Sequence, residues 1–151
     1  MIAVIQRVSQ GEVKIHGKSR GKITNGLVIL LGVAEEDEIH DADWLAEKIA
    51  GLRIFSDADE RMNLSIKEID GQVLVISQFT LLADYKRGRR PGFIRAAKPE
   101  KAIPLYEHFM DQLWMNDIQV EKGEFGADMQ VSLVNEGPVT MVLDSTVKFP
   151  R

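Results

Sequence analysis

The sequence predicts an α+β fold, with a mainly antiparallel, barrel-like β structure and two principal helices. Segments rich in β-forming residues outnumber segments with a helical repeat, and several of their connections have hairpin length. The chain has 151 residues, the length of one domain, and 44% of them are hydrophobic, which is enough to build a core. We therefore expect a single domain over residues 1–151.

The N-terminal region predicts strands joined by turns. Residues 2–8 form a short β-rich run, and residues 12–16 alternate polar and apolar side chains as a half-buried strand does. His16-Gly17-Lys18 is typical of a turn, and it leads to a returning strand over residues 20–24.

A central strand and a helix follow. Asn25-Gly26 is a strong turn signal, and residues 27–33 are apolar throughout, which predicts a strand buried on both faces. Residues 39–52 predict a helix, because apolar side chains recur there at a spacing of 3.6 residues. Four acidic residues, 35–38, precede this helix, where the helix dipole favours negative charge.

The C-terminal half predicts a second helix among strands. Residues 72–78 are another apolar β-rich run, and residues 83–97 are typical of a long loop. Pro99 begins a helix through about Met115, in which Pro104 predicts a shifted start or a kink. Further strands are expected over 117–122, 128–135 and 138–144.

Composition narrows the classes of function. The absence of cysteine excludes disulfides, Cys-ligated zinc and a Cys nucleophile, and no P-loop or dinucleotide fingerprint supports a nucleotide cofactor. The net charge of −4 argues against a general nucleic-acid binder but is compatible with one local basic patch. The longest apolar run, residues 27–34, is too short to span a membrane, and no secretory signal is visible, so we expect a cytoplasmic protein.

Two polar segments are weak candidates for chemistry when taken alone. Ser77-Gln78-Phe79-Thr80 follows an apolar strand, where sites often lie, but structural roles are commoner for such residues. The three histidines fall in no triad or metal motif. Asp57-Ala-Asp59-Glu60 lacks the glycine and distal glutamate of an EF-hand loop, so we expect no metal site.

Two further segments are a Gly-Pro turn and a basic loop. Gly137-Pro138 joins two β-rich runs, and since about 5–6% of X–Pro bonds are cis, frequency alone favours a trans bond. Residues 86–95 carry five positive charges with glycine, proline and Phe93 between them. Such a loop suits an RNA end, although a solvated loop is the simpler interpretation.

Together these segments resemble the D-aminoacyl-tRNA deacylase family over essentially the whole chain. The two signatures, Ser77–Thr80 and Gly137–Thr140, are specific as a pair at this spacing. The segment after about residue 145 lies outside the pattern and is expected to be peripheral. The matching flanks include Ala3–Val8, Leu30–Val33, Arg53–Asp57, Met62–Leu64, Val75–Leu81 and Ala127–Asn135.

The resemblance implies a homodimeric hydrolase that cleaves the ester between a D-amino acid, or glycine, and the 3′-terminal adenosine of tRNA. It implies a site at the dimer interface, where a cis Gly137-Pro138 unit of one subunit enters the pocket of the other. Such a rigid obstruction would reject L side chains by a built-in clash, whereas glycine would pass. Arg7 would hold the Gly137-Pro138 unit by donating hydrogen bonds to the backbone of that unit. Met129 would line the pocket.

For the chemistry we expect backbone amides near Gln78 to Thr80 to form an oxyanion hole, with water attack assisted by the 2′-OH of the tRNA. Thr80 would position groups, because a nucleophilic hydroxyl needs a base and the sequence shows none. The expected catalytic residues are Ser77, Gln78, Phe79 and Thr80, and the expected tRNA contacts are Lys86, Arg87, Arg89, Arg90 and Arg95, with no metal or cofactor.

Two other classes of function stay open. A non-catalytic nucleic-acid-binding module would use the same basic loop and would show affinity without turnover, with a steep salt dependence. A small-molecule esterase with a Ser77 or Thr80 nucleophile would turn over free amino-acid esters and would lose nearly all activity in Thr80→Ala.

Overall fold

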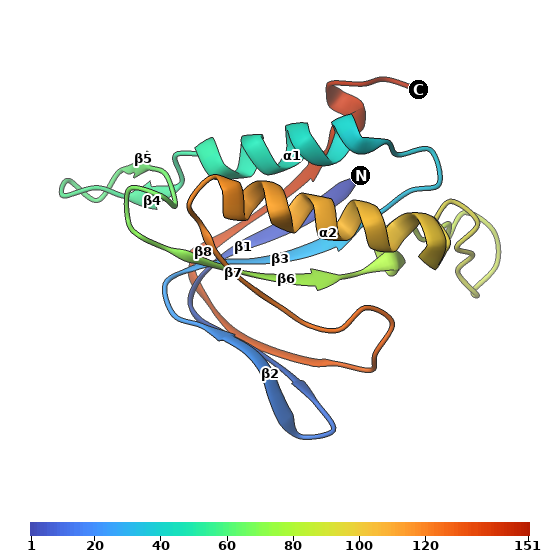
Figure 1. The fold of residues 1–151 in the computed structure, drawn as a ribbon, viewed down its shortest axis with the longest axis horizontal. Helices are drawn as coiled ribbons and strands as arrows, with labels where there is room; N and C mark the ends of the chain where they lie inside the picture. Colours follow the sequence, from blue (N-terminus) through green and yellow to red (C-terminus); the bar gives the residue numbers. More distant parts are fainter.

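The computed structural model describes all residues, 1–151, and shows an α+β architecture in which two helices cover one face of a mixed sheet (Figure 1). The expected fold class is confirmed. The main-sheet strands are β1 Ile2–Ile15, β2 Lys18–Ile23, β3 Gly26–Gly32, β6 Gln72–Ser77, β7 Gln119–Lys122 and β8 Gln130–Asp144. The other elements are α1 Ile39–Gly51, β4 Phe55–Ser56, β5 Met62–Leu64, α2 Pro99–Met115 and the 3₁₀ turns η1 Phe79–Leu82 and η2 Ser145–Val147.

Strand β1 organises the sheet because it pairs with three other strands. Its first half pairs antiparallel with β3, its second half with β2, and its other edge with β8 along most of its length. From β3 outward the pairing becomes parallel, to β6 and then to β7. Strand β2 approaches these last two strands: a Cβ on Gly21 would lie 3.0 Å from the Lys122 carbonyl oxygen. The sheet therefore nearly closes into a barrel.

The two helices lie side by side on the sheet and enclose the larger core (Figure 1). Their apolar faces supply Leu45, Ile49 and Phe109, all fully buried against β1, β3 and β6. Helix α2 begins at Pro99, where a missing N–H is harmless, and continues through Pro104, so its start is not shifted. Neither helix is long and apolar enough to cross a membrane.

In two places, a pair of strands that the sequence predicts to be separate forms one continuous strand in the structure. The expected strands over 2–8 and 12–16 form β1, and those over 128–135 and 138–144 form β8 despite Pro138. The long antiparallel pairing of β1 with β8 explains both results, because each strand supplies hydrogen-bond partners across the other's irregular point. Irregularities remain in the register, between Gln6 and Val8 and between Val8 and Gln10.

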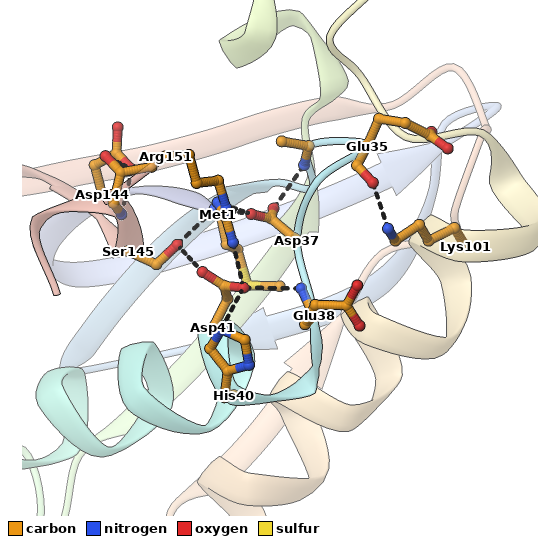
Figure 2. Close-up of polar contacts among 12 residues, drawn as sticks. Met1, Glu35, Asp37, Glu38, His40, Asp41, Lys101, Asp144, Ser145 and Arg151 are labelled. Atoms are coloured by element: carbon orange, nitrogen blue, oxygen red, sulfur yellow. Dashed lines mark hydrogen bonds and ion pairs between the residues drawn. The ribbon is translucent and has the colours of Figure 1, made fainter. Parts of the chain in front are cut away.

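A buried ionic cluster joins the two ends of the chain to the start of α1 (Figure 2). The α-amino group of Met1 donates to Asp37 at 2.5 Å and to the Ser145 hydroxyl at 2.7 Å. The guanidinium of Arg151 contacts both Asp37 and Asp41, at 3.0 and 2.6 Å. Two cations thus face two fully buried carboxylates, which satisfies the requirement that buried charges be paired.

Candidate active site

A cavity of about 300 Å³ opens where the parallel strands β3 and β6 end. Carboxyl ends of parallel strands are a common place for ligand sites, because the loops that leave them diverge there. Helix α2 forms one wall, and the segment between β7 and β8 forms another. The lining residues are Leu31, Val33, Ile76, Ser77, Gln78, Phe79, Ala97, Ala102, Tyr106, Phe125, Gly126, Ala127, Asp128, Met129 and Val131.

Three of the four expected catalytic residues, Ser77, Gln78 and Phe79, line this cavity. The backbone N–H of Gln78 donates to the Leu31 carbonyl at 2.8 Å, which fixes the start of η1 against the end of β3. The side-chain amide of Gln78 donates to Oγ1 of Thr80, a residue that is exposed and outside the lining. The structure therefore brings all four residues to one edge of the cavity.

The edge formed by Ser77 to Thr80 depends on a close approach between the end of β3 and η1. A Cβ on Gly32 would lie 3.0 Å from the carbonyl oxygen of Gln78 and 2.7 Å from the Leu82 side chain. Only glycine lets the end of β3 lie so close to η1. The position of the Ser77 to Thr80 segment therefore depends on the absence of a side chain on the neighbouring strand.

The ionisable side chains that line the cavity are Asp128 and Tyr106, and neither forms a hydrogen bond with Ser77 or Thr80. The Tyr106 hydroxyl donates to the Val75 carbonyl at 3.1 Å, and burial together with the charge of Glu107 raises the pKa of Tyr106 to about 12. This phenol stays neutral at physiological pH. The histidines lie elsewhere: His108 contacts Asp43 at 2.5 Å, His40 packs on Phe149, and His16 forms a turn.

Arg7 and the Gly137-Pro138 unit lie outside this cavity. The Gly137-Pro138 bond is cis, and both residues are exposed. Arg7 donates from Nε to the Glu136 carbonyl at 3.0 Å and from Nη1 to the Ile54 carbonyl at 2.8 Å. A Cβ on Gly137 would lie 2.7 Å from Nη2 of Arg7. The chain thus holds this unit firmly but does not bring it into its own cavity.

The basic loop lies at the N-terminal end of α2 (Figure 1). Two hydrogen bonds between the backbones of Asp84 and Gly92, at 2.7 and 2.8 Å, close it at its base. Phe93 packs edge-on against Phe79 with ring centroids 5.0 Å apart, and this contact joins the loop to the lining. The cations Lys86, Arg87, Arg89, Arg90 and Arg95 are all exposed.

The acidic segment that superficially suggests a metal site organises a small hairpin instead. The Asp57 carboxylate accepts hydrogen bonds from the backbone N–H groups of Asp59 and Arg61 and from the amide of Asn63. The Arg61 hydrogen bond is the main cause that lowers the pKa of Asp57. These contacts order the connection between β4 and β5.

Comparison with known families decides the class of the protein. The family described as D-Tyr-tRNA(Tyr) deacylase matches residues 4–144. The chain belongs to this family. A D-aminoacyl-tRNA deacylase from Akkermansia muciniphila is 58% identical, over 96% of this chain and 97% of that protein. One from Thermotoga petrophila is 51% identical, over 99% of this chain and all of that protein.

Two solved structures share the fold of this chain. A protein titled c-Myc DNA Unwinding Element Binding Protein has a TM-score of 0.88 at 34% identity, covering 95% of this chain and 98% of that one. A probable eukaryotic D-amino acid tRNA deacylase has a TM-score of 0.81 at 15% identity, over 94% and 97% of the two chains, and shows the fold alone. The predicted resemblance and the predicted class of enzyme, a hydrolase acting on aminoacyl-tRNA, are confirmed.

Two residues that line the cavity of this deacylase were not predicted from the sequence. Met129 lies in the lining, and Tyr106 and Phe125 also form its wall, with ring centroids 6.0 Å apart. Tyr106 lies on the apolar face of a helix, where the periodicity indicates a core residue. Phe125 lies in a short connection that carries no motif. Only their position in space identifies them.

Proposed function

We propose that this deacylase hydrolyses the ester bond of D-aminoacyl-tRNA and of glycyl-tRNA, with release of the amino acid and free tRNA. The observation that carries the proposal is the cavity edge formed by Ser77, Gln78 and Phe79, which opens beside an exposed basic loop. A mostly apolar cavity with a few polar groups at one edge suits a small acyl-adenosine end. The adjoining cations suit the phosphates that follow it.

In this proposal, backbone N–H groups stabilise the transition state. The N–H of Gln78 is committed to the Leu31 carbonyl, so the donors would be the N–H groups of Phe79 and Thr80, in the first turn of η1. Water attacks the ester carbonyl, negative charge develops on its oxygen, and these donors face that oxygen. The 3′-oxygen of the tRNA leaves with the proton that the attacking water gives up, and the neighbouring 2′-OH assists this transfer.

The role of Thr80 follows from its surroundings. Its hydroxyl contacts the amide of Gln78, and neither ionisable side chain of the lining, Asp128 or Tyr106, is hydrogen-bonded to it. An unactivated hydroxyl is a poor nucleophile. We therefore assign Thr80 to positioning, together with Ser77, and assign the attack to water.

Selection against L-amino acids would come from the Gly137-Pro138 unit of a second subunit. The unit is exposed, fixed by Arg7 and absent from the lining of its own cavity, as a part that acts in a partner's pocket should be. Strand β8 pairs on one edge alone and exposes Val131, Val134 and Val142. Such an edge suits a symmetric dimer contact. In a homodimer, the obstruction would occupy the space that an L side chain needs.

A second candidate function is a nucleic-acid-binding module without turnover. One structural relative is titled as a DNA unwinding element binding protein, and the exposed basic loop offers a surface for phosphates. This candidate predicts affinity that falls steeply with salt and no release of amino acid. The net charge of −4 disfavours it.

The deciding experiment compares D-Tyr-tRNA with L-Tyr-tRNA, each incubated with the purified protein at matched concentrations. We expect fast release of the D-amino acid and release of the L-amino acid at the rate without protein. Glycyl-tRNA should also be hydrolysed, because glycine offers no side chain to reject. Bound tRNA without release would favour the binding module. Equal release of both enantiomers would contradict the proposed filter.

A further inference from the structure

Gly123 stands where β7 passes into the wall of the cavity. Its N–H donates to the Val75 carbonyl at 3.3 Å, which extends the β6–β7 pairing by one residue. Its backbone is outside the left-handed region, so its conformation does not require glycine. A glycine is therefore needed here because there is no room for a side chain at position 123.

The side chain of Met129 fills that space. A Cβ on Gly123 would lie 2.5 Å from Sδ of Met129, well inside normal van der Waals separation. The same Cβ would lie 3.4 Å from Ile76 and 3.6 Å from Val13, both of which are buried. A methyl group at position 123 would thus displace the sulfur, and the buried side of the site is closed to it.

The Met129 side chain has free space only on the side that faces the cavity. Met129 and Ile76 both line it, and its volume is about 300 Å³. Methionine has three rotatable bonds, so its thioether moves readily into free space. A methyl group at position 123 would therefore narrow the cavity through Met129.

We propose that Gly123 is a positioning residue for substrate binding, because it leaves room for the Met129 sulfur and so sets the width of the cavity that receives the acylated 3′ end of tRNA. This inference rests on the proposed function. It concerns a residue outside the cavity lining, which acts through its neighbour.

The first test is Gly123→Ala in the full chain, assayed with D-Tyr-tRNA. We expect KM to rise roughly tenfold while kcat stays within about twofold, since the narrowed cavity weakens the bound substrate and the transition state alike. Gly51→Ala is the matched control: Gly51 is exposed at the end of α1, and a Cβ there meets nothing within 4 Å. Its KM should equal that of the wild type.

The second test is the double variant Gly123→Ala with Met129→Ala, compared with Met129→Ala alone. With the thioether removed, the methyl group at position 123 has nothing to displace, so the two variants should have the same KM. A KM defect that persists in the double variant would overturn the proposal, because Gly123 would then act through the backbone. If Gly123→Ala alone does not fold, this comparison still decides whether Gly123 acts through the Met129 side chain.

A third measurement follows the side chain directly, through ¹³C-methyl spectra of the six methionines. The Met129 methyl signal should shift in Gly123→Ala and stay unchanged in Gly51→Ala. An unmoved signal, or an unchanged KM in Gly123→Ala, would overturn the inference alone. A wild-type protein without turnover of D-Tyr-tRNA would instead overturn the proposed function.

Discussion

The hydroxyl of Thr80 accepts a hydrogen bond from the Gln78 side chain and lies at the start of η1, at the edge of the cavity. The Gln78 backbone N–H is already bonded to Leu31, and the phenol of Tyr106, held near a pKa of about 12, stays protonated. At the scale of single residues, the Ser77 to Thr80 edge therefore offers fixed hydrogen-bond donors, and no ionisable side chain is hydrogen-bonded to its hydroxyl groups. This composition suits stabilisation of an oxyanion better than formation of a covalent intermediate.

Replacement of Thr80 by alanine separates these two mechanisms. We expect kcat/KM for D-Tyr-tRNA to fall roughly 10- to 100-fold, because the Gln78 side chain loses its acceptor and the edge loosens. Loss of a nucleophile would instead reduce turnover by about 10⁴-fold or more. Thr80→Ser keeps the hydroxyl and should remain near the wild-type value. Activity abolished in Thr80→Ala, with the fold intact by circular dichroism, would favour the nucleophile.

At the scale of elements, the start of α1 is held by charges from both ends of the chain (Figure 2). Burial by itself would raise the pKa of Asp41. Hydrogen bonds from Ser145 and the Glu38 backbone, with the charges of Arg151 and the α-amino group, outweigh burial and hold that pKa below its ordinary value. A carboxyl whose pKa is lowered by folding stabilises the fold above its unfolded pKa, and this contribution is lost as the pH falls through the folded value.

Arg151→Ala should therefore destabilise the protein in a pH-dependent way. At pH 7 we expect the free energy of unfolding to fall by about 2 kcal/mol, because Asp37 and Asp41 remain buried with one cation fewer. The difference between variant and wild type should shrink as the pH falls below the unfolded pKa of about 3.9 and through the lower folded pKa of Asp41. Urea unfolding at pH 7 and pH 3 measures both values.

The control for this prediction is Lys148→Ala, an exposed cation in the same segment that forms no ion pair in the structure. Its unfolding free energy should match that of the wild type at both pH values. A constant difference for Arg151→Ala across this range would contradict the assignment to the carboxylates. It would indicate lost packing instead.

At the scale of the whole molecule, the cavity and the Gly137-Pro138 unit lie apart in one chain. Residues 136–139 leave the β1–β8 pairing beside Arg7, whose two carbonyl contacts hold them in place. A rigid unit that projects from an edge strand can act only on something that approaches that edge. In the proposed homodimer, this is the cavity of the partner.

Mixed dimers test whether the unit acts across subunits. Ala127→Trp places an indole in the cavity lining, and Gly137→Ala forces a Cβ against Arg7 at a φ of 128°. Neither homodimer should hydrolyse the D-ester selectively. After unfolding and refolding together, about a quarter of all sites should pair an open cavity with an intact Gly137, since half the dimers are mixed and each has one such site.

Selective release of D-tyrosine should then return at about that fraction of the wild-type rate. Refolding each variant separately before mixing provides the control. If the unit acted within its own chain, no site in the mixture would be complete, and selectivity would stay at the level of the separate variants. Size-exclusion chromatography of the wild type checks the dimer on which the experiment depends.

Much of the fold could be predicted because local patterns and tertiary packing agree. The helix over residues 39–52 and the central strand over 27–33 correspond closely to α1 and β3, since their hydrophobic patterns match the faces that the sheet buries. The divided strands were wrong because the irregular points near Val8 and Pro138 are bridged by partners far away in the chain. The parallel pairs β3–β6 and β6–β7 likewise join strands that are far apart in the chain, so no local pattern indicates which strands pair.

The sequence by itself determined the family, through the Ser77–Thr80 and Gly137–Thr140 signatures. It also determined the pattern of apolar residues by which the strands are buried. Only the tertiary structure decided that Ser77, Met129 and Tyr106 share one cavity and that Gly137 does not reach it. The physical reason is that local patterns reflect burial and turn geometry, which depend on neighbours in the chain. A cavity depends on distances between elements, and contacts such as that of Gly123 with Met129 exist only after the sheet has closed.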